Sequence, residues 1–174
     1  MFKYLVFCCT WMIVLLIANS AYSQNQYWLS GGLGKSQFPS GMVALGYEFS
    51  NRPTLLIARY SANGQVFSAD QPGIKVNELG LLYGLKVGNF RFSTGLSGVW
   101  GTNRGKYLYS DPDPLMYGST YYEPIKYATV GVPAEIRFIS SRRRIGLGVT
   151  GFGNWNAKRS FAGLNLSLYV GQMK

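Results

Sequence analysis

Apolar and small polar residues alternate with a period of two along most of this chain. Near the C-terminus, for example, Leu164 and Leu166 alternate with Asn165 and Ser167. Successive strand side chains point to opposite faces of a sheet, so the pattern predicts strands with one apolar and one polar face. After residue 24, helical spacing of apolar residues is nowhere sustained over eleven or more positions. We therefore expect an all-β protein.

The alternation divides the chain into eight expected strands. These cover residues 26–34, 41–50, 54–62, 76–87, 90–100, 125–139, 144–154 and 161–171. Tight turns are expected at 51–53, 88–89 and 140–143, whereas the connections 63–75 and 101–124 are long. Short turns at one end and long loops at the other are typical of transmembrane β-barrels. A tilted strand of about ten residues is long enough to cross a bilayer.

The composition of the two faces indicates which one is outside. Only 14% of the residues are charged, against about 25% in an ordinary soluble domain. The polar face is mostly Gly, Ser, Thr and Asn, which suits the lining of a narrow barrel, and the apolar face suits lipid. Aromatic residues are expected near the turn side (Tyr47, Phe49, Phe90, Phe92, Phe138) and near the loop side (Tyr60, Trp100, Trp155, Phe161). A soluble, lipocalin-like barrel would bury its apolar face and carry charge outside.

The first 23 residues have the pattern of a secretory signal peptide. Lys3 precedes an apolar run over residues 4–18, and Ala21 and Ser23 provide the small residues of a cleavage site. We expect cleavage before Gln24, which leaves residues 24–174 as one barrel domain. Both cysteines lie in the removed segment, so the exported chain would contain no disulfide.

The chain has a signal segment, eight alternating strands, short turns alternating with long loops, and a final strand from Phe161 to Gly171. In these features it resembles the small bacterial outer-membrane β-barrel proteins of the OmpA/OmpX-like group. The resemblance implies an eight-stranded antiparallel up-and-down transmembrane β-barrel with short periplasmic turns and longer extracellular loops. It also implies a monomer in the cell outer membrane, inserted by the barrel-assembly machinery and in contact with outer-membrane lipid and lipopolysaccharide.

Seven ionisable side chains are expected to point into the barrel. They are Glu48, Arg59, Glu78, Lys86, Arg91, Glu135 and Arg137. Charges in so confined a space must pair or be hydrated, and we interpret them as a structural ion-pair network that closes the lumen. Glu135 with Arg91 or Lys86 is the first pair we expect. A narrow ion path is the alternative.

The segment 101–124 is expected to be a large extracellular loop containing five tyrosines. Tyrosine suits recognition surfaces because it provides a large contact area at a low entropic cost. The candidate recognition residues are Arg104, Lys106, Tyr107, Tyr109, Tyr117, Tyr121 and Tyr122. The positive charge of the loop side also favours contact with anionic lipopolysaccharide. The extracellular partner itself is not identified by the sequence.

Several functions are not expected. The chain has no His, which removes the usual zinc sites and His-dependent acid–base catalysis, and no nucleophile constellation is evident. We expect no catalytic residue, cofactor or metal. The formal charge is +10, but export and the lack of a basic helix argue against nucleic-acid binding. The expected function is a non-enzymatic structural, adhesive or surface-recognition role. A small porin-like channel and an exported soluble lipocalin-like ligand-binding barrel remain as alternatives.

Overall fold

Strands form almost the whole of the described chain. The computed structural model describes residues 26–65, 70–111, 120–142 and 144–173. The strands are β1 (Gln26–Lys35), β2 (Pro39–Glu48), β3 (Thr54–Gly64), β4 (Asp70–Gln71), β5 (Lys75–Val87), β6 (Phe90–Ser110), β7 (Thr120–Arg142), β8 (Ile145–Asn156) and β9 (Phe161–Gln172). Within these ranges, no helix has the length and apolar character needed to cross a bilayer.

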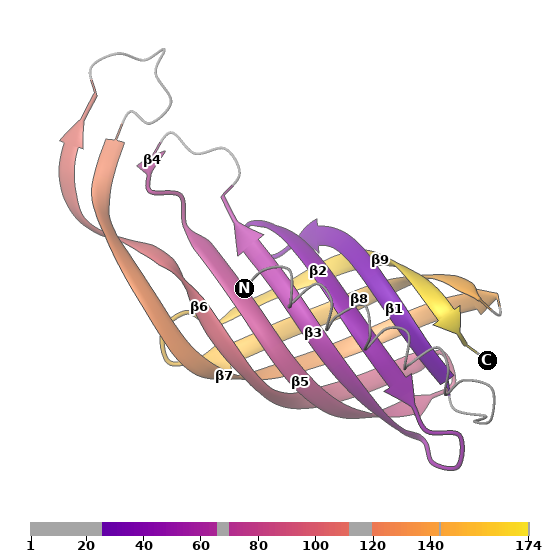
Figure 1. Ribbon diagram of the computed structural model, residues 1–174. Helices are drawn as coiled ribbons and strands as arrows, with labels where there is room; N and C mark the ends of the chain where they lie inside the picture. Colours follow the sequence, from indigo (N-terminus) through magenta and orange to yellow (C-terminus); the bar gives the residue numbers. More distant parts are fainter. Residues whose placement is uncertain (1–25, 66–69, 112–119, 143, 174) are drawn as a thin grey trace, which may run out of the picture.

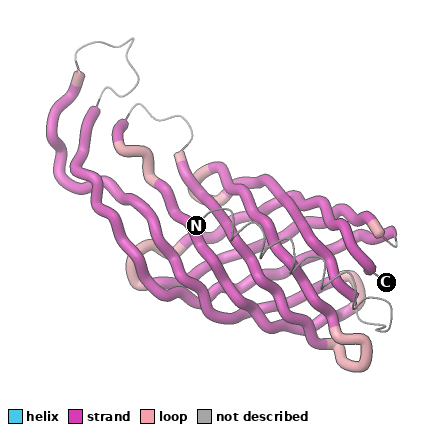
Figure 2. The backbone as a smooth tube through the Cα atoms, in the orientation of Figure 1, coloured by secondary structure: helices cyan, strands magenta, loops and turns pink. Residues whose placement is uncertain are grey.

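The eight long strands close into one antiparallel barrel, which confirms the expected fold (Figures 1 and 2). Neighbours in sequence pair with each other around the sheet, and β3 pairs with β5. Closure comes from β1 pairing with β9 and β7 pairing with β8. The two-residue β4 adds a short parallel bridge to the start of β7.

The alternation places apolar side chains on the outer face, as the sequence predicts. In β9, Leu164 and Leu166 are each 64% exposed, whereas Asn165 and Ser167 are 1% and 2% exposed. In β6, Phe92 points outward and Arg91 and Ser93 point inward. Large apolar side chains cover the outside of the other barrel strands in the same way. A soluble protein rarely exposes so continuous an apolar surface.

The interior contains two apolar clusters in addition to its polar lining. The first consists of Trp28, Ala44, Leu55, Ile57, Leu82, Ile139, Tyr169 and Met173. The second consists of Met42, Val76, Val99, Phe152 and Phe161. Strand β3, whose facing is ambiguous in the sequence, contributes Leu55 and Ile57 to the first cluster and points Tyr60 outward. The lumen is therefore packed partly like a protein core.

The connections alternate as expected, but the expected long loop 101–124 is wrong for most of its length. β6 continues to Ser110 and β7 begins at Thr120, so the two strands stay paired well beyond the rest of the barrel (Figure 1). We call residues 103–110 and 120–125 the arm. Its strands are irregular, with register shifts on both sides of Tyr107. These irregularities interrupt the period-two pattern, and the sequence alone therefore does not predict the arm.

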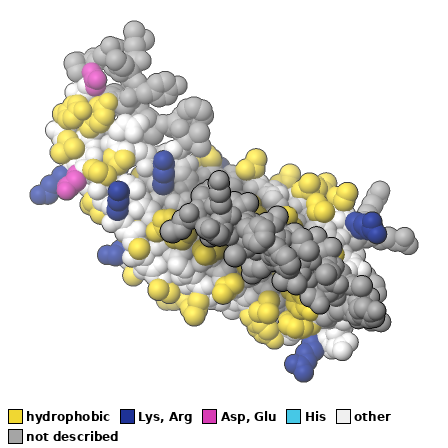
Figure 3. Space-filling view, viewed as in Figure 1, with side chains coloured by type: hydrophobic (Ala, Val, Ile, Leu, Met, Phe, Trp, Pro, Cys, Tyr) yellow, Lys and Arg dark blue, Asp and Glu magenta, His cyan; other side chains and the backbone are white. Residues whose placement is uncertain are grey.

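Aromatic side chains gather near both ends of the outer surface. At the turn side, the Phe90 ring lies 6.2 Å from that of Phe92 and 5.2 Å from that of Phe138. At the loop side, the Tyr60 and Trp100 rings are 6.3 Å apart. Figure 3 shows apolar side chains along the barrel wall. The placement of Phe161 among the outer aromatics is wrong: it is 6% exposed and packs inward against Phe152.

The outward position of Leu166 gives a test of this surface. In a bilayer, Leu166→Arg should lower the free energy of unfolding by about 2–4 kcal/mol, because the charge lies among lipid chains. Denaturant titration of the refolded barrel measures this, with Leu166→Val as the size control. A lipid-soluble quencher should reach a label at position 166 and not one at 167. The reverse accessibility would contradict the assignment of the faces.

Candidate functional site: the ion-pair network of the interior

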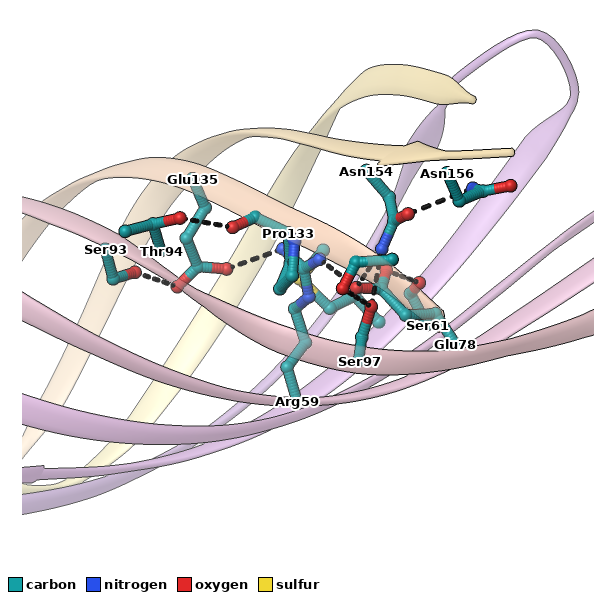
Figure 4. Close-up of polar contacts among 12 residues, drawn as sticks. Arg59, Ser61, Glu78, Ser93, Thr94, Ser97, Pro133, Glu135, Asn154 and Asn156 are labelled. Carbon is teal, nitrogen blue, oxygen red and sulfur yellow. Dashed lines mark hydrogen bonds and ion pairs between the residues drawn. The ribbon is translucent and has the colours of Figure 1, made fainter. Parts of the chain in front are cut away.

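Four fully buried charged side chains form the centre of the lumen. The Arg59 guanidinium contacts Glu78 Oε1 at 2.6 Å and Glu135 Oε2 at 2.9 Å. Arg137 binds the same Glu135 carboxylate with two nitrogens, Nε at 2.6 Å and Nη2 at 2.9 Å. Two cations and two carboxylates thus form a continuous chain across the barrel, whose middle portion is drawn in Figure 4.

Strand register brings these groups together. Arg59 on β3 lies opposite Gly80 on β5, and Gly80 lies opposite Ser97 on β6. A Cβ at the inward position of Gly80 would crowd Leu82 and Ser97, each at 3.3 Å. Glu135 is on β7, opposite Ser93, so it approaches Arg59 from across the barrel. The narrow diameter of an eight-stranded barrel makes such transverse contacts possible.

Hydroxyl and amide groups donate the remaining hydrogen bonds to the carboxylates of Glu78 and Glu135. Glu78 accepts hydrogen bonds from Ser61 Oγ at 3.1 Å and from Asn154 Nδ2 at 2.9 Å. Glu135 accepts one from Ser93 Oγ at 2.9 Å. Asn154 also donates to Ser97 Oγ at 2.7 Å, which ties β8 to β6 (Figure 4). Buried carboxylates with this many donors are satisfied without water.

A second group surrounds Glu48 near the turn end. Its carboxylate contacts Lys86 Nζ at 2.8 Å and Arg91 Nε at 3.0 Å. Trp28 Nε1 also donates to Glu48, at 2.9 Å, and Lys86 donates to Gln26 Oε1 at 2.8 Å. All seven ionisable residues expected in the lumen therefore lie there and take part in ion pairs.

Trp28 and Arg137 connect the two groups. The Arg137 guanidinium lies over the Trp28 ring at 5.1 Å, a cation–π distance. Its Nη1 donates to Ser30 Oγ at 3.2 Å and to Tyr169 Oη at 3.4 Å. The ring of Tyr169 packs edge-on against Trp28 at 5.2 Å. Apolar and ionic contacts alternate along the lumen, so the whole interior is one packed unit.

The expected pairing of Glu135 with Arg91 or Lys86 is wrong. Glu135 binds Arg59 and Arg137, whereas Arg91 and Lys86 bind Glu48. Arg91 and Arg137 are cross-strand partners, and like charges at adjacent positions repel. The Arg91 guanidinium is kept apart from Arg137 because it extends toward Glu48 on β2, on the other side of the barrel.

Some residues of the interior are not anticipated from the sequence. These are Trp28, Tyr169 and Asn154, each of which joins parts of the network. The sequence pattern indicates that they face inward, but it does not indicate their partners. Their shared signal is a polar atom on an inward residue, which requires a partner when buried. Among the described residues, no group of His, Cys, Asp or Glu could hold a metal ion.

Six of the seven candidate recognition residues lie on the arm. The rings of Tyr109 and Tyr121 stack at 4.5 Å, and those of Tyr107 and Tyr122 meet edge-on at 6.1 Å. Lys106 is exposed. Tyr117 lies outside the described residues. The structure therefore brings four of the expected tyrosines together in two cross-strand pairs.

The Arg104 side chain contacts the β3–β5 connection. It donates to Gln65 Oε1 at 2.7 Å and to the Pro72 carbonyl at 3.0 Å, and it pairs with Asp70 at 3.1 Å. The guanidinium also lies 5.6 Å from the Tyr122 ring. These contacts fasten the connection to the base of the arm, so Arg104 is mainly a structural clamp.

Comparison with solved structures shows the same fold. The N-terminal β-barrel domain of Pseudomonas aeruginosa OprF matches with a TM-score of 0.52 and 9% identity, covering 86% of this chain and 98% of that one. Neisserial surface protein A gives a TM-score of 0.44 at 12% identity, covering 84% and 94%. Ail of Yersinia pestis gives 0.48 at 9% identity, covering 85% and 99%. The sequence matches no protein-family model and no curated protein.

The buried network should carry much of the barrel's stability. Glu135→Gln keeps the shape of the side chain but leaves Arg59 and Arg137 without one counter-charge, and we expect a loss of about 3–5 kcal/mol in unfolding free energy. Ser93→Ala, which removes one hydrogen bond to the same carboxylate, should cost about 1 kcal/mol. Denaturant titration compares the two. Equal effects would show that the charge of Glu135 is not what matters.

The packed interior should not conduct ions. In planar bilayers the purified protein is expected to give no steady conductance, because paired side chains fill the cross-section. The variant Glu48→Gln tests the turn end of the lumen. It removes the counter-charge of Lys86 and Arg91 and leaves the central chain of ion pairs in place. Reproducible single-channel steps from the wild-type protein would contradict the closed lumen and favour the channel alternative.

Proposed function

We propose that this protein is a non-enzymatic barrel of the bacterial outer membrane that recognises a partner at the cell surface through its arm. The arm is the observation that carries the proposal. Its two paired strands continue beyond a closed barrel (Figure 1). Aromatic side chains on these strands are exposed to solvent. The likeness to outer-membrane barrels supports the fold, and the recognition role rests on the arm itself.

The outer surface supports placement in a membrane. Exposed Leu, Val, Ile and Phe side chains cover the barrel wall, with aromatic contacts toward both ends. An apolar band between two aromatic girdles matches the exterior of outer-membrane barrels. In that family the short turns face the periplasm, which would put the arm outside the cell. We expect a monomer inserted by the barrel-assembly machinery, because the closed sheet needs no second chain.

The surface of the arm suits recognition. Tyr107 and Tyr109 are 59% and 55% exposed, and Leu108 between them is 57% exposed. Their cross-strand contacts with Tyr122 and Tyr121 hold the rings in defined positions. Ordered aromatic side chains lose little entropy on binding and are frequent in binding hot spots. A flexible loop of the same composition would have a larger entropic cost.

The clamp at Arg104 supports the same interpretation. Its bonds to Gln65, Asp70 and Pro72 join the β3–β5 connection to the arm, and β4 pairs with the first residues of β7. The base of the arm is therefore held by a third segment. Preorganisation of this kind strengthens binding because less ordering remains to be done. A structural role alone would not require tyrosines at the solvent-exposed positions.

The arm hypothesis is tested by the variant Tyr109→Ser/Tyr121→Ser, which removes the stacked pair and keeps the strands. Cells producing the wild-type barrel should bind to other such cells or to at least one of immobilised collagen, fibronectin and laminin. The variant should bind at least about tenfold less, as expected for hot-spot tyrosines. Lys158→Gln, in the β8–β9 connection, is the matched control and should bind like the wild type.

Labelling shows whether the arm is outside the cell. A membrane-impermeant maleimide should modify Tyr109→Cys on intact cells and Arg52→Cys only after permeabilisation. Labelling in the opposite order would contradict the proposed orientation. Correct labelling together with no binding to any of these surfaces would reject the recognition role and leave a structural one.

A further inference from the structure

Two exposed lysines lie close together on the outer face of the barrel, at the base of the arm. Lys75 begins β5 and Lys126 is on β7, and both side chains point outward. In the sheet, Lys75 is opposite Thr102 of β6, and Thr102 is opposite Lys126. Neighbouring strands are about 4.8 Å apart, so the two lysine backbones are roughly 10 Å apart with a hydroxyl between them. Lys and Arg side chains gather at this end of the barrel (Figure 3).

These lysines have no charge partner within the described part of the chain. The ion pairs of the loop side consist of Arg104 with Asp70, and neither Lys75 nor Lys126 takes part in one. Glu123 is three residues before Lys126, on the opposite face of β7. The pair therefore presents uncompensated positive charge, which is complementary to a phosphate group.

Aromatic side chains lie directly below the lysines on the same face. Trp100 precedes Thr102 by two positions on β6, and its ring contacts that of Tyr60. The Tyr60 hydroxyl donates to Asn77 Oδ1 at 3.2 Å. Asn77 is two residues after Lys75 on β5 and lies on the same face of the strand. Tyr and Trp mark the level of lipid headgroups in membrane proteins. Lys75 and Lys126 would therefore lie at the depth of the outer-leaflet phosphates.

A surface hollow of about 490 Å³ adjoins Lys75. Leu33, Gly41 and Ala62 form its apolar floor, and Gln65, Lys75 and Asn77 form a polar wall. The hollow exists because small residues occupy adjacent outward positions on β2 and β3. It has an apolar part facing the barrel wall and a polar part at the rim, as the junction between a headgroup and an acyl chain requires.

We propose that Lys75, Thr102 and Lys126 bind the phosphate of a phosphorylated lipid of the outer leaflet, with the top of one acyl chain in the hollow beside Lys75. The proposal rests on the outer-membrane placement described above and is independent of any partner of the arm. It assigns a specific lipid site to one part of the barrel's circumference, rather than general attraction to a basic rim.

The test measures binding of lipid A to the purified barrel in a zwitterionic detergent, followed by the shift in thermal unfolding midpoint as lipid A is added. Lys75→Gln and Lys126→Gln should each weaken binding roughly fivefold, which corresponds to the contribution of one lysine near a lipid surface. Lys158→Gln removes the same charge elsewhere on the loop side and should bind like the wild type. Heat-modifiable gel mobility without lipid shows that each variant is folded.

The hollow is tested separately by Gly41→Leu. A Cβ at Gly41 would meet only Leu33, at 3.8 Å, so the larger side chain can fill the hollow without disturbing the backbone. This variant should weaken lipid A binding and leave the barrel folded. If it binds like the wild type while the lysine variants do not, the phosphate site stands and the acyl-chain position is wrong.

Two further ligands distinguish the sources of phosphate. Dephosphorylated lipid A should give no lysine-dependent shift, and inorganic phosphate should not compete at millimolar concentration. Competition by inorganic phosphate would replace the lipid proposal with a site for a free anion. Equal binding by the lysine variants and the control would overturn the proposal. Labelling in the opposite order would put the lysines at the periplasmic leaflet and overturn the outer-leaflet proposal, even with lipid A binding intact.

Discussion

Closure of the sheet is the constraint on which the rest of this structure depends. β1 pairs with β9 and β7 with β8, so each barrel strand has a neighbour on both sides. In hydrocarbon, every unpaired backbone group costs several kcal/mol, and a closed barrel avoids that cost. Closure with eight strands also makes the interior narrow. The inward side chains are therefore forced into contact, and any charge among them must find a partner there.

The interior meets this demand by alternating ionic and apolar contacts. Arg59, Glu135 and Arg137 neutralise one another at the centre, while Leu55, Ile57 and their neighbours pack as a small core nearer the turns. Trp28 belongs to both, because its ring lies under Arg137 and its indole nitrogen binds Glu48. Removing an ion here would therefore disturb apolar packing as well. This coupling favours a rigid barrel.

The period of the sequence is enough to predict the number of barrel strands and the face of each inward charge. It does not predict which inward groups meet, because Glu48 and Arg91 lie on β2 and β6 and touch only across the lumen. Local pattern contains no information about such transverse contacts. The arm is missed for a related reason: Tyr109 and Tyr121 support each other between strands whose alternation is broken. Phe161 is misplaced because the prediction groups it with the loop-side aromatic residues, although the alternation puts it on the same face as Asn165 and Ser167.

The seam between β1 and β9 has a consequence for how the barrel forms. Tyr27 pairs with Gln172 and Lys35 with Leu164, so the first and last strands of the barrel are joined. Gly32 and Gly34 permit this, since side chains there would overlap with Ser167 and Asn165. The seam cannot form until β9 has been synthesised, and pairing at such large sequence separation is slow. Until then β1 retains an open edge that can pair with other chains. Substitutions at Gly32 or Gly34 would therefore act first on assembly yield and aggregation, even where the finished barrel tolerates them.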